Sequence, residues 1–154
     1  MTQYPASMDE IDRRILNVLH DHGRVSNADL AAAVGLSPSP CLRRVRRLEA
    51  AGVIRGYRAV IDPAAIGRGL RVIVGVRLAR HALKDVQAFE KAVVALPGVV
   101  ETHHVTGNFD YLVHVEVADL GAYEEFHAKR LAGLPGVSIV NSYVVMKTMP
   151  SAQN

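Results

Sequence analysis

The sequence has no tryptophan, one cysteine and few aromatic residues, with three phenylalanines and five tyrosines among 154 residues. The single cysteine, Cys41, excludes an intramolecular disulfide and is typical of a reducing compartment. No apolar run approaches the length of about 18 residues that a membrane-spanning helix needs. The N-terminal residues also lack the basic region and apolar run of a signal peptide. These absences predict a soluble, cytoplasmic protein without a membrane partner.

Positive charge is concentrated in one part of the chain. The net charge is only +3, which is too small by itself to indicate a nucleic-acid partner. Residues 37–58, however, carry six arginines against one acid, Glu49, so their local excess is larger than the net charge of the whole chain. The six are Arg43, Arg44, Arg46, Arg47, Arg55 and Arg58.

The first third of the chain has the spacing of three short helices. Apolar residues at positions 11, 15, 18 and 19 predict a helix over 8–22. A second helix begins at a cap, Ser26 or Asn27, and ends at Gly35, and a third runs from a Ser37 cap to about residue 51. Residues 53–62 predict a β-hairpin, or wing, that continues into an exit strand. We therefore expect a winged helix-turn-helix domain over 8–62 and a hinge over 63–69, which contains a proline and two glycines.

The third predicted helix has two chemically different faces. Pro38 and Pro40 fall in its first turn, where backbone N–H groups have no partner within the helix and proline is tolerated. At about 100° per residue, Cys41, Leu42, Val45 and Leu48 share one face, Arg43 and Arg47 lie opposite, and Arg44 and Arg46 flank them.

Such a helix is suited to the major groove of DNA. Its small N-terminal residues allow close approach, and arginines bind phosphates and guanine edges. The alternative, a solvated basic helix, is disfavoured by the two preceding helices and the arginines that follow. The candidate DNA-binding residues are Asn27, Ser37, Ser39, Pro40, Arg43, Arg44, Arg47, Arg55 and Arg58.

Residues 70–150 have a different pattern, with elements in the order βαββαβ. The tetrapeptide LPGV occurs at 96–99 and again at 134–137, and this offset of 38 superposes two βαβ halves. The pattern predicts a ferredoxin-like α+β domain with both helices on one face of the sheet. In one strand, alternate residues are expected to face the helices, namely Phe109, Tyr111, Val113, Val115 and Val117. Because the other face is also partly apolar, we expect it to be buried against another subunit.

Both halves resemble one family of regulators. Residues 11–63 closely resemble the DNA-binding half of the Lrp/AsnC (feast/famine) family, and HHVTGNFDYLVHVEV and LPGVSIVNSYVVMK resemble the signature stretches of its ligand-binding half. The resemblance implies a DNA-binding transcriptional regulator whose assembly or DNA binding responds to a small effector, usually an amino acid. It also implies a homodimer that assembles further to a tetramer or octamer. No cofactor is predicted.

The same resemblance implies an effector site in the second domain. Its members are His104, Val105, Thr106, Gly107, Asn108, Phe109, Asp110 and Ser138. Gly107 permits a positive φ and exposes N–H groups that can hold a carboxylate, while Asp110 can receive an ammonium group. From the residues alone, an ordinary hairpin with a Gly-Asn turn is the favoured explanation of the stretch, and it is the resemblance that favours the effector site. Many family members have Gly-Asp where this chain has Gly107-Asn108, so a leucine-like ligand does not follow.

The sequence leaves three other kinds of function to consider. A metal site is disfavoured because His103 and His104 point to opposite faces of one strand. An enzyme is the main alternative, since sirohaem decarboxylases resemble this architecture and would use His104, His114 and His127. A metabolite-binding or assembly module is the third. Neither of the last two needs the arginine-rich helix, so no catalytic residue is predicted.

Overall fold

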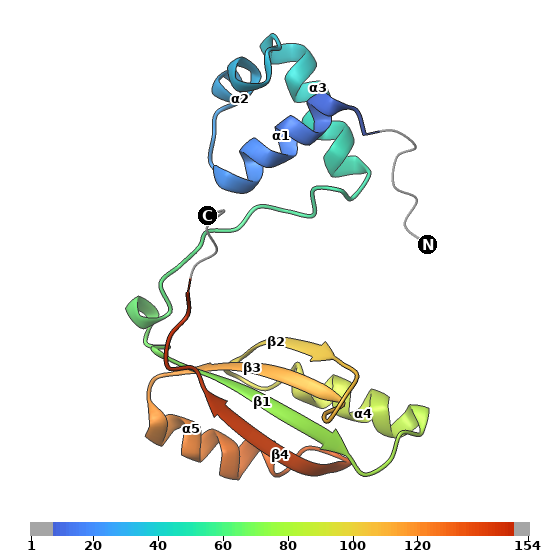
Figure 1. Cartoon of the computed structure of the whole chain (residues 1–154), viewed down its shortest axis with the longest axis vertical. Coiled ribbons are helices and arrows are strands. Elements are labelled where there is room, and N and C mark those ends of the chain that lie inside the picture. The colour runs from blue at the N-terminus through green and yellow to red at the C-terminus, as the bar shows by residue number, and fades with distance from the viewer. Residues whose placement is uncertain (1–7, 150–154) are drawn as a thin grey trace. The chain divides into compact units, whose positions relative to one another are not determined.

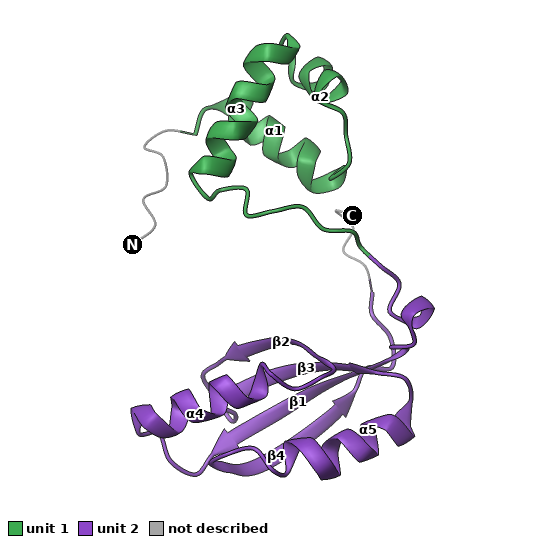
Figure 2. Ribbon diagram, turned by 180° about the vertical axis from the view of Figure 1, so that it is seen from behind, with its two compact units in different colours: residues 1–60, 151–154 green, residues 61–150 purple. Residues whose placement is uncertain are grey.

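The computed structural model describes residues 8–149, whose contacts divide the chain into two units between Val60 and Ile61 (Figures 1 and 2). The division lies inside the segment predicted as a wing and exit strand. Within the described residues, no helix combines the length and apolar character needed to cross a membrane.

The N-terminal unit consists of the three predicted helices, α1 (Glu10–Asp21), α2 (Asn27–Val34) and α3 (Pro38–Ala50). Ser26 caps α2 through a hydrogen bond from the N–H of Asp29, as its position after a polar turn predicts. One apolar side chain from α1 meets three from each of the other helices, and these buried residues are Ile15, Leu30, Ala31, Val34, Cys41, Val45 and Leu48. The prediction of three packed helices is confirmed.

The hairpin predicted over 53–62 is absent, and this prediction was wrong. Residues 53–62 contain no strand, and the next element is a short 3₁₀ turn, η1 (Ala64–Ile66). The N–H groups of Val53 and Ile54 instead donate to the carbonyl of Leu48, which closes the end of α3. Val53 and Ile54 pack against the helical core, whereas Val60 is fully exposed, and the described residues of this unit contain no strand with which the segment could pair.

The C-terminal unit has the predicted βαββαβ order. Its elements are β1 (Leu70–Leu78), α4 (Leu83–Val93), β2 (Val99–His104), β3 (Tyr111–Val117), α5 (Leu120–Phe126), the π-helical turn η2 (His127–Leu131) and β4 (Val137–Val144). The strands form one antiparallel sheet in the order β2-β3-β1-β4, and both long helices cover the same face (Figure 1). This is the ferredoxin-like arrangement.

The two faces of the sheet differ in burial. Valines 72, 74 and 76 of β1 and valines 113 and 115 of β3 are fully buried on the side of the helices. The opposite side, called the open face below, carries Ile73, Leu112, Ile139 and Tyr143. Ile139 is 43% exposed and Tyr143 is 50% exposed, so this face presents apolar surface that the unit itself does not cover.

Candidate DNA interface and effector loop

Helix α3 begins as predicted. Ser37 holds the N-cap position with extended backbone angles, although its side chain makes no capping hydrogen bond, and Pro38 is the first helical residue. Cys41 is completely buried, and desolvation raises the pKa of its thiol, so the residue packs as a small apolar group. Leu42 was expected in the core but is exposed, because its position faces a groove of about 340 Å³ whose lining includes Leu19 and Val25.

A buried carboxylate joins α1 to α3. Asp12 is 0% exposed and lies in the first turn of α1, where it forms a capping box with the N-cap residue Asp9. Arg44 Nη1 donates to Asp12 Oδ1 over 2.9 Å and to Asp9 Oδ2 over 2.7 Å, and Arg47 also donates to Asp12. The N–H of Asp12, followed by the Arg44 guanidinium, holds the pKa of Asp9 below its ordinary value. These two carboxylates raise the pKa of Arg44 in turn.

The arginines of α3 therefore fall into two groups, which the sequence did not separate. Arg44 is held between two acids with 24% of its side chain exposed, so it positions the helix. Arg47 keeps 52% of its side chain exposed while it binds Asp12. Arg43 and Arg46 are exposed and form no ion pair within residues 8–149. Asp9 and Asp12 have the spacing of a helix start, but their contact with α3 has no signal in the sequence.

The other predicted DNA-binding residues lie around the start and end of α3. Asn27 Nδ2 donates to the carbonyl of Pro38 over 3.0 Å, so this side chain joins α2 to α3. Ser39 is exposed in the first turn of α3, and Pro40 is half-buried. Arg55 and Arg58 are exposed in the extended segment after the helix, where the wing was expected.

The predicted effector loop is longer than a tight Gly-Asn turn. Strand β2 ends at His104 and β3 begins at Tyr111, and the N–H of Val105 closes the loop by donating to the carbonyl of Asp110 over 2.9 Å. Gly107 has a φ of 117°, which a residue with a side chain rarely adopts. Thr106, Gly107 and Asn108 form an exposed tip.

Both carboxylate oxygens of Asp110 already have partners within the chain. Its Oδ2 accepts the N–H of Leu78 over 2.7 Å, and its Oδ1 lies 3.0 Å from His81 Nε2. The N–H of Leu78, and less strongly His81, lowers the pKa of Asp110. Ser138 lies near the same end of β1, where its Oγ donates to the carbonyl of Arg77 over 3.0 Å. Asp110 and Ser138 thus bind the two sides of one peptide group of β1, between Arg77 and Leu78, and both side chains have partners in the chain.

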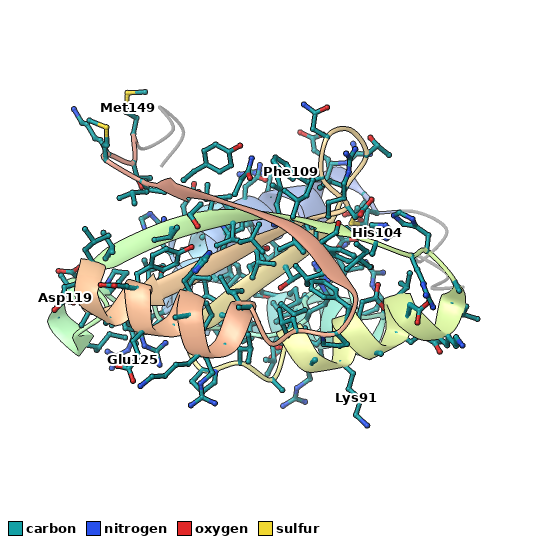
Figure 3. All side chains as sticks on the ribbon, turned by 90° about the horizontal axis from the view of Figure 1, so that it is seen from below. Lys91, His104, Phe109, Asp119, Glu125 and Met149 are labelled. Carbon is teal, nitrogen blue, oxygen red and sulfur yellow. The ribbon has the colours of Figure 1, made fainter. Side chains whose placement is uncertain are left out.

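Phe109 was expected to face the helices and instead lies on the open face (Figure 3). It precedes β3 in the loop, so the alternation of that strand does not extend to it. His104 stacks on Tyr111 with ring centroids 4.7 Å apart. The buried Tyr111 hydroxyl donates to Glu90 over 2.9 Å, and burial, followed by this carboxylate, raises the pKa of Tyr111 to about 12.

The histidines of the enzyme alternative do not converge. His104 lies at the end of β2 against Tyr111, while His114 lies on the open face with its ring 5.3 Å from that of His103. His127 begins η2, with its ring 6.2 Å from that of Tyr123. Among residues 8–149, no three histidine, cysteine or acidic side chains are arranged to hold a metal ion.

Comparisons with known proteins agree over nearly the whole chain. Residues 8–55 match the family model described as winged helix-turn-helix DNA-binding, and residues 71–153 match the model of the Lrp/AsnC ligand binding domain. The leucine-responsive regulatory protein of Escherichia coli K12 is 46% identical over 140 residues, which cover 91% of this chain and 85% of that protein. The corresponding protein of Haemophilus influenzae is 45% identical over 92% of this chain and 85% of its own length.

Solved structures show the same similarity. The transcriptional regulator NMB0573 of Neisseria meningitidis, solved as an L-Met complex, is 35% identical, with a TM-score of 0.89 over 94% of both chains. An AsnC family regulator of Agrobacterium tumefaciens is 36% identical, with a TM-score of 0.88 over 94% of both chains.

Proposed function

Because this chain belongs to the Lrp/AsnC family of DNA-binding transcriptional regulators, we propose that α3 contacts duplex DNA and that loop 104–110 binds an amino acid. The relatives are named as regulators, which supports this function over the decarboxylase alternative. We place the protein in the cytoplasm, where the DNA of its bacterial relatives lies.

The exposed cationic face of α3 carries the DNA-binding half of the proposal. Arg43 has no acidic partner among residues 8–149, and Arg47 offers its remaining N–H donors to solvent. The helix N-terminus adds partial positive charge beside the small residues Ser37 and Ser39. We assign Arg43 and Arg47 to contacts with bases or phosphates, and Ser37, Ser39, Pro40, Arg55 and Arg58 to the flanking surface. Asn27 and Arg44 position the helix.

A salt titration tests this assignment. Each phosphate neutralised by a protein cation releases counterions, so log K should fall with log[salt] by about 0.9 per contact. Arg43→Ala should weaken binding to random duplex DNA and reduce the magnitude of the slope by about one. Arg130→Ala removes the same charge from η2 of the other unit and serves as the matched control. An unchanged slope for Arg43→Ala, or an equal loss in the control, contradicts the assignment.

Loop 104–110 supports the effector half of the proposal. The exposed N–H groups around Gly107 suit a carboxylate, and the Thr106 hydroxyl is exposed beside them. The neisserial neighbour was solved with L-Met, which makes L-methionine and L-leucine the first amino acids to test. A ligand that binds only the folded chain raises its melting temperature. If none of the twenty amino acids does so, the effector assignment is wrong.

The open face supports self-association. Ile139 and Tyr143 are half-exposed on a sheet whose other face is covered by helices, and apolar surface of this kind is typical of an interface. We propose that a second copy covers this face and that such dimers assemble to a tetramer or octamer. Tyr143→Asp should shift sedimentation towards monomers, and an unchanged assembly would contradict the proposed interface.

A further inference from the structure

Gly75, in the middle of β1, leaves room for the ring of Phe109. A Cβ built on Gly75 would lie 2.7 Å from Phe109 Cδ2 and 2.8 Å from two other ring atoms. Separations below 3.0 Å essentially never occur at real Cβ atoms. The ring therefore rests directly on bare backbone, and Gly75 is buried although it lies on the open face.

This ring is part of the apolar centre of the open face. Gly75 pairs with Leu112 of β3 and with Asn141 of β4, so the contact is in the interior of the sheet. The Phe109 ring is also edge-on to Tyr143, with centroids 6.3 Å apart. A loop residue thus contributes to the surface that we assign to self-association.

The same residue is coupled closely to the tip of the loop. Phe109 directly follows Asn108. The next residue, Asp110, is fixed to β1 because its N–H donates a hydrogen bond to the carbonyl of Val76 over 2.9 Å. Because Asp110 is fixed to β1, a change in the backbone of residues 106–108 cannot be absorbed beyond Phe109 and therefore moves Phe109 itself.

We propose that Phe109 links the effector loop to the self-association surface and that Gly75 is the residue that positions its ring; this proposal rests on the proposed function. Ligand at the loop tip changes how the ring lies on Gly75, and this changes the face that a second copy contacts. Coupling between two binding events is reciprocal, so assembly alters ligand affinity by the same factor as ligand alters assembly.

Gly75→Ala is the direct test, because an added methyl group must displace the ring towards the partner. The expected result is a dimer dissociation constant raised about tenfold or more, together with a changed affinity for L-leucine or L-methionine, whichever stabilises the wild-type chain. Sedimentation velocity measures the first quantity and isothermal titration the second. Gly133→Ala is the matched control, since its Cβ would meet nothing closer than the carbonyl of Arg130 at 3.7 Å.

A double variant separates the steric contact between Gly75 and Phe109 from a general loss of stability caused by the added methyl group. In Phe109→Ala the ring is gone, so adding Gly75→Ala should cause no further change in association or ligand affinity. This comparison also decides the case in which Gly75→Ala alone fails to fold, because the double variant should then fold like Phe109→Ala. If the double variant is worse than Phe109→Ala, or Gly75→Ala changes neither or only one of the two quantities, the link is refuted.

The outcomes also distinguish the link from the proposed function. A wild-type chain that binds none of the amino acids contradicts the effector function and the link together. A wild-type chain that binds ligand and changes its assembly, while Gly75→Ala responds identically, contradicts the link alone. Ligand binding that leaves wild-type assembly unchanged also refutes the link.

Discussion

Removing the charge of Asp12 should cost the N-terminal unit a large part of its stability. The carboxylate is 0% exposed and accepts hydrogen bonds from Arg44, Arg47 and the N–H of Asp9. Breaking a buried ion pair costs about 3–5 kcal/mol when the remaining charge stays buried. Here the two guanidinium groups are 24% and 52% exposed and can regain water, so we expect Asp12→Asn to cost about 2–3 kcal/mol. For a unit of this size, that loss lowers the melting temperature by roughly 10–20 °C.

Circular dichroism at the helical band, followed during thermal and urea unfolding, measures this loss. Glu10→Gln is the control, because it removes one negative charge from the same helix turn at an exposed position without an ion pair among the described residues. The control should change stability by less than about 1 kcal/mol, the size of a helix-dipole contribution. If the free energies of unfolding of Asp12→Asn and Glu10→Gln lie within about 0.5 kcal/mol of each other, the stabilising role assigned to the contact of Asp12 with Arg44 and Arg47 is wrong.

Three further predictions concern single side chains. Arg44→Ala should lower the melting temperature of the N-terminal unit, whereas Arg43→Ala should not, and equal losses in unfolding experiments would contradict their different roles. The folded pKa of Asp110 lies below the ordinary 3.8, so its stabilisation is present above that pH and is lost as the pH falls through the lowered value. Acid unfolding of Asp110→Asn should therefore show a weaker pH dependence than that of the wild type. Identical acid-unfolding curves for the two chains would contradict the stabilising role of the Asp110 carboxylate. Tyr111→Phe should cost about 1 kcal/mol for its lost hydrogen bond to Glu90, and alkaline absorbance titration should lose an ionisation near pH 12.

Local patterns predicted the elements well because each has a short-range cause. The capping hydrogen bond of Ser26 specifies where α2 begins, and Pro38, the first residue after the N-cap position of Ser37, specifies where α3 begins. Both signals act before any tertiary contact forms. The strand and helix patterns of successive segments predicted the βαββαβ order, and the repeated LPGV tetrapeptide indicated its two βαβ halves. The alternation of apolar residues identified the face of β3 that meets the helices.

Long-range contacts were not predictable from spacing. The arginines of α3 have the same helical pattern whether or not an acid of α1 meets them, so nothing near Arg44 indicates its contact with Asp12, 32 positions away. The hairpin predicted over 53–62 did not form for a similar reason, since apolar residues around Gly56 favour a strand only if a partner strand is present. Phe109 was misplaced because alternation was extended past the start of β3 at Tyr111.

The contact with Asp12 also explains how the basic face of α3 can be both fixed and accessible. An apolar stripe alone gives a helix no directional contact that fixes its rotation about its axis, because the hydrophobic effect is non-directional. Arg44 and Arg47 restrict that rotation, since their shared carboxylate is buried and anchored in the capping box of α1. Arg43 is then directed outward by the contacts of its neighbours, although its own side chain is free. The entropy of orienting α3 is therefore lost on folding, before any partner binds.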